Sequence, residues 1–207
     1  MEEFKRNCGK LFGKDEVILD NGGGSGICTD VLREQKITDK IYALDISPTV
    51  LKERDPRDIC TVGDMENLPY TDGFFDRVFF AAALHHVKNT KKALDEAKRV
   101  LKPNGHVVLV EPVSLKLRIL GQGIRPTPDG VEFSFSLPYV LRHLKQSGFI
   151  VERIYYQGFL KRFLRKSGSK TLRLASRTED LVNNVPLIRE ISSIFSNFVS
   201  IVARKNS

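Results

Sequence analysis

The sequence predicts an α/β fold in which a mainly parallel β-sheet is covered by helices on both faces. Over residues 1–112, short apolar runs alternate with amphipathic helical stretches, which is the pattern of βαβ units. The length of 207 residues suits one domain, and 41% apolar against 28% charged residues is ordinary for a globular protein. The composition therefore excludes a largely disordered chain.

The first half of the chain carries five short apolar runs that we interpret as strands. They are Glu16–Asp20, Lys40–Asp45, Ile59–Val62, Phe75–Ala82 and His106–Val110. Helices are predicted between them, at Ser25–Gln35, from Ser47–Pro48 onward and at Thr90–Leu101. A turn is expected at Pro103–Gly105.

The pattern changes after residue 112. Val113–Phe135 contains three Gly and Pro turn signals and is predicted to be a long functional loop. A helix is expected from Ser136 to about Ser147, where Gly148 ends it. Two further strands are predicted at Phe149–Tyr156 and Phe195–Ala203, with residues 158–192 between them mostly helical.

Cysteine usage and the N-terminal residues favour a cytoplasmic protein. Cys8, Cys28 and Cys60 form no C-x-x-C pair, so no metal site is expected. Their odd number fits a reducing compartment, and Met1–Asn7 has no apolar run of the kind found in secretory signals. The longest apolar run, Val78–Leu84, has seven residues, whereas a membrane span needs about 18.

A glycine-rich loop, D-N-G-G-G-S-G over Asp20–Gly26, lies between a predicted strand and a predicted helix. Glycines there allow a tight turn and close approach of a ligand to the backbone. The dinucleotide fingerprint G-x-G-x-x-G would need glycine at position 27, which is Ile27. The acid that ends the strand suits a ligand with a cationic head better than a pyrophosphate.

Two further strand ends carry acids. Asp45 can accept hydrogen bonds from both hydroxyls of a ribose. Gly63–Asp64–Met65 offers a carboxylate for an adenine amine and an apolar side chain for its ring. Asp20 and Asp45 could instead cap the helices that follow them.

On these motifs the chain resembles the class I S-adenosylmethionine-dependent methyltransferases, in the broad small-molecule group that includes the quinone-biosynthesis enzymes. The matching segments are Val17–Gly26, Ala43–Ser47, Gly63–Pro69, Phe74–Asp76 with Ala83–Val87, Arg99–Gly105 and Val199–Lys205. The resemblance is close over residues 16–112 and loose over 136–205. It implies a Rossmann-like three-layer sandwich, with a seven-stranded, mostly parallel sheet whose last strand is antiparallel and inserted beside the sixth. Residues 1–207 would form one domain, with a cofactor half at 1–112 and an acceptor or lid half at 113–207.

The resemblance also implies S-adenosyl-L-methionine as cofactor. The residues that it places around the cofactor are Asp20, Gly22, Gly23, Gly24, Gly26, Asp45, Ile46, Asp64, Met65 and Ala81. Asp20 and the glycines would hold the methionine portion, Asp45 the ribose, and Ile46 the adenine ring. Ala81 would lie near the methionine amino group.

His85 is the candidate catalytic residue, because it follows the fourth strand where an acceptor should meet the methyl group. It could act as a general base, whereas His86 is expected to be structural. A capping or core role for His85 is the alternative, since positioning alone can drive much of a methyl transfer. Glu111 could line the acceptor pocket or pair with an arginine such as Arg125.

Residues 159–178 carry seven basic residues and no acid, interleaved with apolar side chains. This stretch could be a solvated face packed over the acceptor pocket, could contact an anionic membrane surface, or, less favoured, could bind nucleic acid. About 15 residues precede the first strand, so the lid over the cofactor is expected to be short, absent, or supplied by residues 113–135, by the insertion at 158–192 or by a second subunit.

The sequence thus favours a methyltransferase acting on a small, apolar or lipid-like acceptor. A non-catalytic S-adenosylmethionine-binding module or partner subunit is the first alternative. A nicotinamide-dependent oxidoreductase is the second, and Ile27 argues against it. The oligomeric state is not determined by these patterns.

Overall fold

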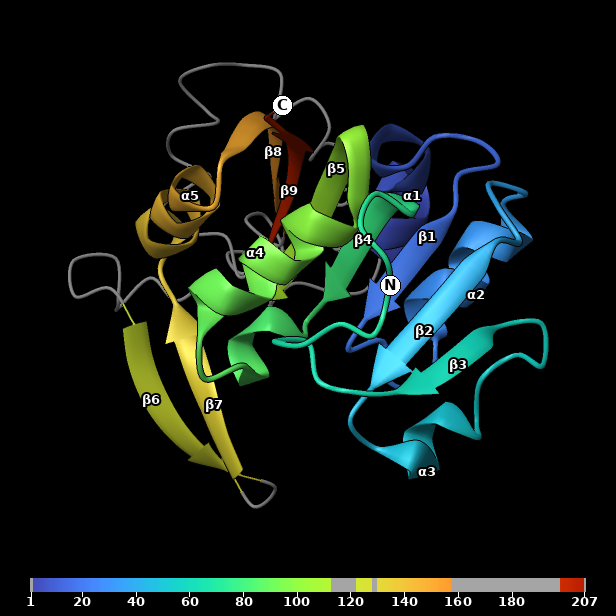
Figure 1. Ribbon diagram of the computed structural model, residues 1–207, viewed down its shortest axis with the longest axis horizontal. Helices are drawn as coiled ribbons and strands as arrows, with labels where there is room; N and C mark the ends of the chain where they lie inside the picture. Colours follow the sequence, from blue (N-terminus) through green and yellow to red (C-terminus); the bar gives the residue numbers. More distant parts are fainter. Residues whose placement is uncertain (1, 113–121, 128–129, 158–197, 207) are drawn as a thin grey trace, which may run out of the picture.

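A seven-stranded sheet forms the centre of the molecule in the computed structural model, which describes residues 2–112, 122–127, 130–157 and 198–206. Its strand order is β3-β2-β1-β4-β5-β9-β8 (Figure 1). The strands are β1 (Ile18–Asn21), β2 (Ile41–Asp45), β3 (Ile59–Val62), β4 (Phe75–Ala81), β5 (Leu101–Pro112), β8 (Phe149–Gln157) and β9 (Phe198–Lys205). Strands β1 to β5 pair in parallel, and β9 is antiparallel between β5 and β8. The predicted α/β fold, with its last strand inserted beside the preceding one, is confirmed.

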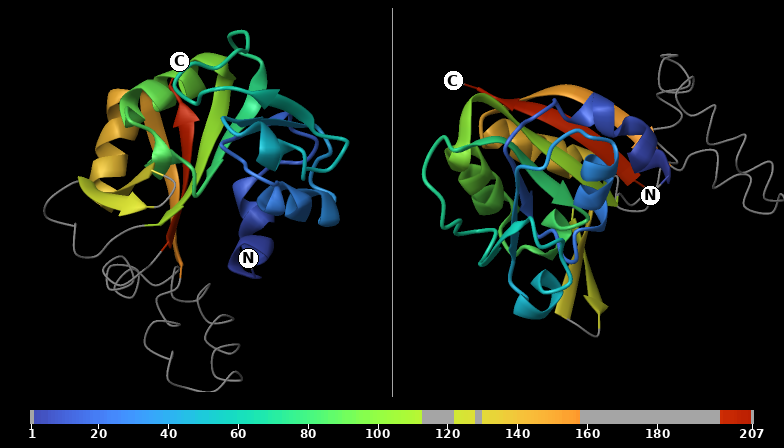
Figure 2. Two further views of the ribbon diagram at one scale, coloured as in Figure 1. Left: turned by 90° about the horizontal axis from the view of Figure 1, so that it is seen from below. Right: turned by 90° about the vertical axis from the view of Figure 1, so that its right-hand side faces the viewer.

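Helices cover both faces of the sheet, which gives three layers (Figure 2). They are α1 (Glu2–Leu11), α2 (Ile27–Glu34), α3 (Pro48–Leu51), α4 (Thr90–Val100), α5 (Leu137–Gln146) and the short 3₁₀ helix η1 (Leu84–His86). Val78 and Phe80 of β4 pack with α4 and α5, whereas Phe79 packs with α1 and α2. This alternation follows from the period of two along a strand, and it explains why β4 is continuously apolar from Val78 to Ala81.

Helix α1 has no counterpart among the predicted elements. The Phe4 ring stacks on the Phe79 ring with centroids 5.6 Å apart, and Phe12 meets the same ring edge-on at 5.1 Å. Cys8 and Leu11 are fully buried between them. The N-terminal segment therefore belongs to the core on one face of the sheet.

The prediction of a long loop over Val113–Phe135 is wrong for residues 122–127 and 130–135. Strands β6 (Gln122–Thr127) and β7 (Gly130–Phe135) form an antiparallel hairpin there, and β7 lies beside η1 (Figure 1). Apolar and polar residues alternate along β7, the pattern of a strand. Pro126 belongs to a two-stranded ribbon, where every strand is an edge and a missing N–H is tolerated.

Two other boundaries differ from prediction. The turn at Pro103–Gly105 lies inside β5, where the pairing with β4 shifts and Asn104 takes a φ of 61°. The helix that begins at Pro48 has only four residues. The predicted helical insertion at 158–192, with its basic stretch, lies outside the described residues, and the lid assigned to it stays a prediction.

The described helices include none that is long and apolar enough to cross a membrane. Cys8, Cys28 and Cys60 are free thiols. Burial raises the pKa of the Cys28 thiol to about 12, so this thiol is not a reactive nucleophile at neutral pH.

Candidate functional site

The carboxyl ends of β1, β2, β4 and β5 meet at one edge of the sheet, and the predicted site residues lie there. This is the edge at which open α/β sheets bind ligands. The glycine loop follows β1, Asp45 ends β2, η1 follows β4, and Glu111 lies near the end of β5.

The glycine loop is closely packed on one side and open on the other. A Cβ on Gly22 would lie 2.8 Å from the Ala83 Cβ and 2.9 Å from the Met65 Sδ. A Cβ on Gly23 would lie 2.1 Å from an Asp20 carboxylate oxygen, whereas a Cβ on Gly24 would meet no described atom within 4 Å. Gly22, Gly24 and Gly26 have φ values of 76°, 52° and 87°, which favour glycine. The loop therefore offers open space at Gly24 for a ligand.

Asp45 is joined to this loop. Its Oδ2 accepts a hydrogen bond from the Gly24 amide at 3.0 Å, and its Oδ1 accepts one from the Ser47 amide at 2.9 Å. Ile46, the next residue, is 75% exposed, which is unusual for an isoleucine and leaves its apolar side chain available to a ligand. The predicted ribose and adenine residues thus lie beside the predicted loop.

The Met65 side chain reaches the loop at Gly22, whereas the Asp64 side chain points into its own turn. Asp64 is exposed and bonds within its own turn, where its Oδ1 accepts from the Glu66 amide at 2.8 Å. Ala81 ends β4 and is half-buried. Ala82, which follows it, has a φ of 51°, and such strained non-glycine residues cluster at functional sites.

Asp20 is buried beneath the loop. It is 1% exposed, and its Oδ2 accepts a hydrogen bond from Arg54 Nη2 at 3.0 Å. Burial raises the pKa of Asp20, and the Arg54 guanidinium only partly opposes this. Within the described part of the chain, Asp20 Oδ1 and both polar side-chain atoms of Asn21 are buried without a hydrogen-bond partner. Unsatisfied polar atoms at the end of β1 fit a ligand with amino and carboxylate groups, such as the methionine portion of the implied cofactor.

His85 and Glu111 form a buried pair at the same edge. Glu111 is fully buried and His85 is 8% exposed. Glu111 Oε2 lies 2.8 Å from His85 Nδ1, while Oε1 accepts from the amides of Ala83 at 2.9 Å and Leu84 at 2.8 Å. Because the carboxylate only accepts, the Nδ1 atom carries the proton and the Nε2 atom of the neutral ring has a free lone pair.

This arrangement separates the two adjacent histidines and decides the role of Glu111. His85, and not His86, has its ring on the Glu111 carboxylate, although the two rings lie 4.1 Å apart between centroids. Both carboxylate oxygens of Glu111 have partners, so the alternative of a pairing with an arginine such as Arg125 is not needed to satisfy the carboxylate.

Sequence patterns missed Arg54, which donates hydrogen bonds to the carbonyls of Gly23 and Gly24 in the loop. It stands in Lys52–Asp58, a run of mixed charges that has the composition of a solvated surface segment. The one available signal is the short helix α3, which precedes this run and packs beside β2 and β3.

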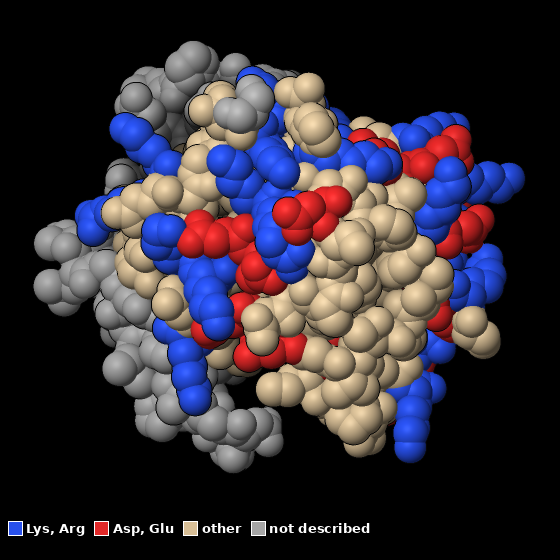
Figure 3. All heavy atoms as spheres, in the orientation of Figure 1, with Lys and Arg blue, Asp and Glu red and all other residues tan. Residues whose placement is uncertain are grey.

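The charged side chains on the face shown in Figure 3 are of both signs and interspersed. Ion pairs among the described residues include Lys91–Asp95 at 2.6 Å and Arg99–Asp72 at 2.8 Å. This face carries no single basic patch among the residues that the structure describes.

Comparison with known proteins identifies the same family as the motifs. The family profile described as a methyltransferase domain matches residues 19–109. The chain is 33% identical over 99 residues to a malonyl-[acyl-carrier protein] O-methyltransferase of Halorhodospira halophila, covering 44% of this chain and 33% of that protein. It is 35% identical over 97 residues to a demethylmenaquinone methyltransferase of Renibacterium salmoninarum, covering 45% and 40%. The chain thus spans less than half the length of these curated relatives.

The fold is shared with solved structures at much lower identity. One is an S-adenosylmethionine-dependent methyltransferase from Mesorhizobium loti. It has a TM-score of 0.66 and 17% sequence identity, over 99% of this chain and 96% of that one. Such a likeness supports the fold, and the profile match supports the family. Residues 19–109 thus match the methyltransferase-domain profile, and this is the family to which the chain is similar.

Proposed function

We propose that this protein is an S-adenosylmethionine-dependent methyltransferase acting on a small acceptor. The observation that carries the proposal is the position of the His85–Glu111 pair at the same sheet edge as a glycine loop that is open at Gly24 and bonded to Asp45. The names of the curated relatives, which act as methyltransferases on an acyl-carrier-bound acid and a quinone precursor, support the reaction class.

In this proposal the cofactor is held by residues from three strand ends. Asp45 would bind the ribose hydroxyls, while Ile46 and Met65 would flank the adenine and Asp64 would accept from its amine. Ala81 and the backbone of the loop, from Gly22 to Gly26, would lie along the methionine portion, with Asp20 and Asn21 satisfying its charged groups. When bound, S-adenosylmethionine supplies an electrophilic methyl group on a sulfonium.

His85 would act as the general base for an acceptor that must lose a proton. Its Nε2 lone pair can take that proton, because Glu111 keeps the proton of the neutral ring on Nδ1 and stabilises the imidazolium that forms. The two backbone amides that bind Glu111 hold the carboxylate in place. The acceptor would therefore be an acidic hydroxyl, amine or carbon acid, and an apolar or lipid-like body would suit the relatives' substrates.

Equilibrium binding and turnover test this proposal separately. Calorimetry should show binding of S-adenosylmethionine and S-adenosylhomocysteine but not of NAD. Formation of S-adenosylhomocysteine with a panel of quinol, phenol, amine and acyl-thioester acceptors should then identify the acceptor class. Binding without turnover on any acceptor would favour the non-catalytic binding module, and binding of NAD alone would favour an oxidoreductase.

Contact with an anionic membrane is a separate proposal, and it depends on the sequence of residues 159–178. Seven cations without an acid, interleaved with apolar residues, suit an anionic lipid surface. Co-sedimentation with vesicles of phosphatidylglycerol, compared with vesicles of phosphatidylcholine alone, tests it. Equal recovery with both kinds of vesicle would contradict a contact with anionic lipid.

A further inference from the structure

The Arg54 side chain is fully buried beneath the glycine loop. A guanidinium has five N–H donors, and acceptors lie within hydrogen-bond distance of all of them. Nη1 donates to the carbonyls of Gly23 at 3.1 Å and Gly24 at 3.2 Å, and Nη2 donates to Asp20 Oδ2 at 3.0 Å and Thr29 Oγ1 at 2.8 Å. Nε donates to Asp58 Oδ2 at 2.7 Å. One side chain therefore joins the end of β1, the loop and helix α2.

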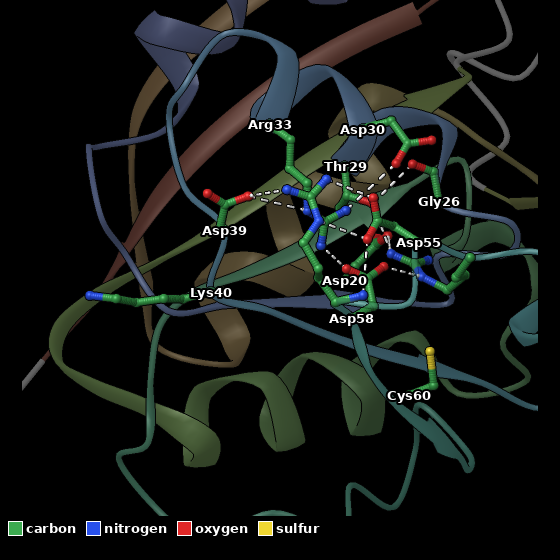
Figure 4. Close-up of polar contacts among 12 residues, drawn as sticks. Asp20, Gly26, Thr29, Asp30, Arg33, Asp39, Lys40, Asp55, Asp58 and Cys60 are labelled. Atoms are coloured by element: carbon green, nitrogen blue, oxygen red, sulfur yellow. Dashed lines mark hydrogen bonds and ion pairs between the residues drawn. The ribbon is translucent and has the colours of Figure 1, made fainter.

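The charges around Arg54 alternate. The side chains of Asp20 and Asp58 are each 1% exposed, and Asp58 also accepts a hydrogen bond from Nη2 of Arg33, whose side chain is 5% exposed. Figure 4 shows Asp20, Thr29 and Asp58 close together, with Arg33 beside them. Buried charges persist only where they are paired and hydrogen-bonded. The three ion pairs in this row of alternating charges therefore hold the Arg54 side chain in one position.

The contacts of Arg54 determine how the loop presents its amides. A peptide unit is planar, so fixing the carbonyls of Gly23 and Gly24 also fixes the orientation of the amides of Gly24 and Ser25. The Gly24 amide points to Asp45 Oδ2. A Cβ on Gly23 would lie 2.6 Å from Arg54 Nη1, so the absence of a side chain at Gly23 and the presence of Arg54 are fitted to each other.

We infer that Arg54 is a positioning residue that holds the glycine loop in its ligand-binding conformation before the ligand arrives. The identity of the ligand rests on the function proposed above. Because Arg54 contacts Asp20, Gly23 and Gly24, its effect is directed to the part of the site assigned to the methionine portion. Substitution of Arg54 should therefore weaken the binding of ligands that carry an amino-acid portion more than the binding of ligands that lack it.

The test compares S-adenosylhomocysteine with 5′-methylthioadenosine, which lacks the amino-acid portion, by calorimetry on Arg54→Lys. Lysine keeps the charge but cannot donate to five acceptors. We expect affinity for S-adenosylhomocysteine to fall by about tenfold or more, the effect of losing hydrogen bonds to a charged group, and affinity for 5′-methylthioadenosine by less than about threefold. Arg57→Ala is the matched control, because Arg57 lies in the same segment but is 61% exposed, and it should leave both affinities unchanged.

Hydrogen exchange gives a readout that needs no ligand. In Arg54→Lys, amides of residues 22–26 should exchange faster while those of β4 and β5 keep their protection. If Arg54→Lys does not fold, the charge-balanced pair Asp58→Asn with Arg54→Gln replaces it, because Asp58 pairs with Arg54 and has no proposed ligand contact, and the same two readouts apply. If the wild-type protein binds neither nucleoside, the proposed function fails, and the exchange result alone then decides the positioning role. The inference would be overturned if a folded variant kept the wild-type hydrogen-exchange rates at residues 22–26, or if it lost affinity for both nucleosides equally.

Discussion

The Glu111 carboxylate lies 2.8 Å from His85 Nδ1 and binds the backbone amides of Ala83 and Leu84 through its other oxygen. One buried side chain near the end of β5 thus shapes the turn after β4 and sets the tautomer of the histidine in that turn. The two functions of Glu111 differ in kind, since the amide contacts are structural and the His85 contact is chemical. Substitutions at the two positions should therefore have different consequences.

His85→Ala should lower turnover by about 10²–10⁴-fold, the usual contribution of a general base. Binding of S-adenosylhomocysteine should stay near the wild-type value, because no proposed cofactor contact involves the His85 ring. Glu111→Gln should lower both turnover and thermal stability, since a buried amide would leave one of the three donors unsatisfied. Wild-type turnover in His85→Ala with every acceptor would show that His85 is structural.

Asp45→Ala should weaken S-adenosylmethionine binding by roughly 1.5–3 kcal/mol, the range for hydrogen bonds to a charged group. The control is Asp39→Ala, whose side chain is 71% exposed and pairs with Arg57 on the surface. Calorimetry on both variants, with far-UV circular dichroism to confirm folding, measures the difference. Equal affinities in the two variants would remove Asp45 from the ribose site.

Gly24→Val should abolish cofactor binding while leaving the sheet formed. Gly24 and Gly73 both have positive φ, 52° and 67°, and a Cβ on either would meet no described atom within 4 Å. Both substitutions therefore introduce backbone strain without a clash, but only Gly24 lies in the proposed site. Gly73→Val should lose comparable stability and keep cofactor affinity. Normal binding by Gly24→Val would make the loop a structural turn.

Glu96→Gln should make the free energy of unfolding less dependent on pH in the acid range. Hydrogen bonds from Arg99 hold the pKa of Glu96 below its usual range. A carboxylate of this kind contributes stability that is fully present above its unfolded pKa of about 4.3 and is lost as the pH falls through its lower folded pKa. The free energy of unfolding should fall by about 1–3 kcal/mol at pH 7, and the difference from wild type should shrink below pH ~4.

Urea denaturation at several pH values measures this difference. Asp95→Asn is the control, because Asp95 and Lys91 form an exposed pair on the same helix, and such pairs contribute about 0–1 kcal/mol. A constant difference between Glu96→Gln and wild type over the whole pH range would contradict the assignment.

Local sequence patterns were sufficient to predict the strands of the seven-stranded sheet and to place the candidate cofactor residues next to them. Periodic apolar runs report burial directly, and parallel strands place their carboxyl ends at one edge, so Asp20, the glycines and Asp45 could be assigned to one site from order along the chain. The hairpin β6–β7 was missed because its Gly and Pro residues were interpreted as loop signals. Helix α1 was missed because its apolar face became evident only against Phe79.

Tertiary structure alone decided which polar side chains meet. Glu111 and His85 are 26 residues apart in the chain, and Arg54 and Asp20 are 34 apart, so no local spacing relates either pair. Their contacts arise because crossover connections bring β5 beside β4 and place the segment after α3 beneath the loop that follows β1. The sequence by itself determined the fold class and the edge of the sheet that carries the proposed site. The burial of an arginine among carboxylates, and of a carboxylate beside a histidine, depends on desolvation and pairing that exist only once distant segments have packed together.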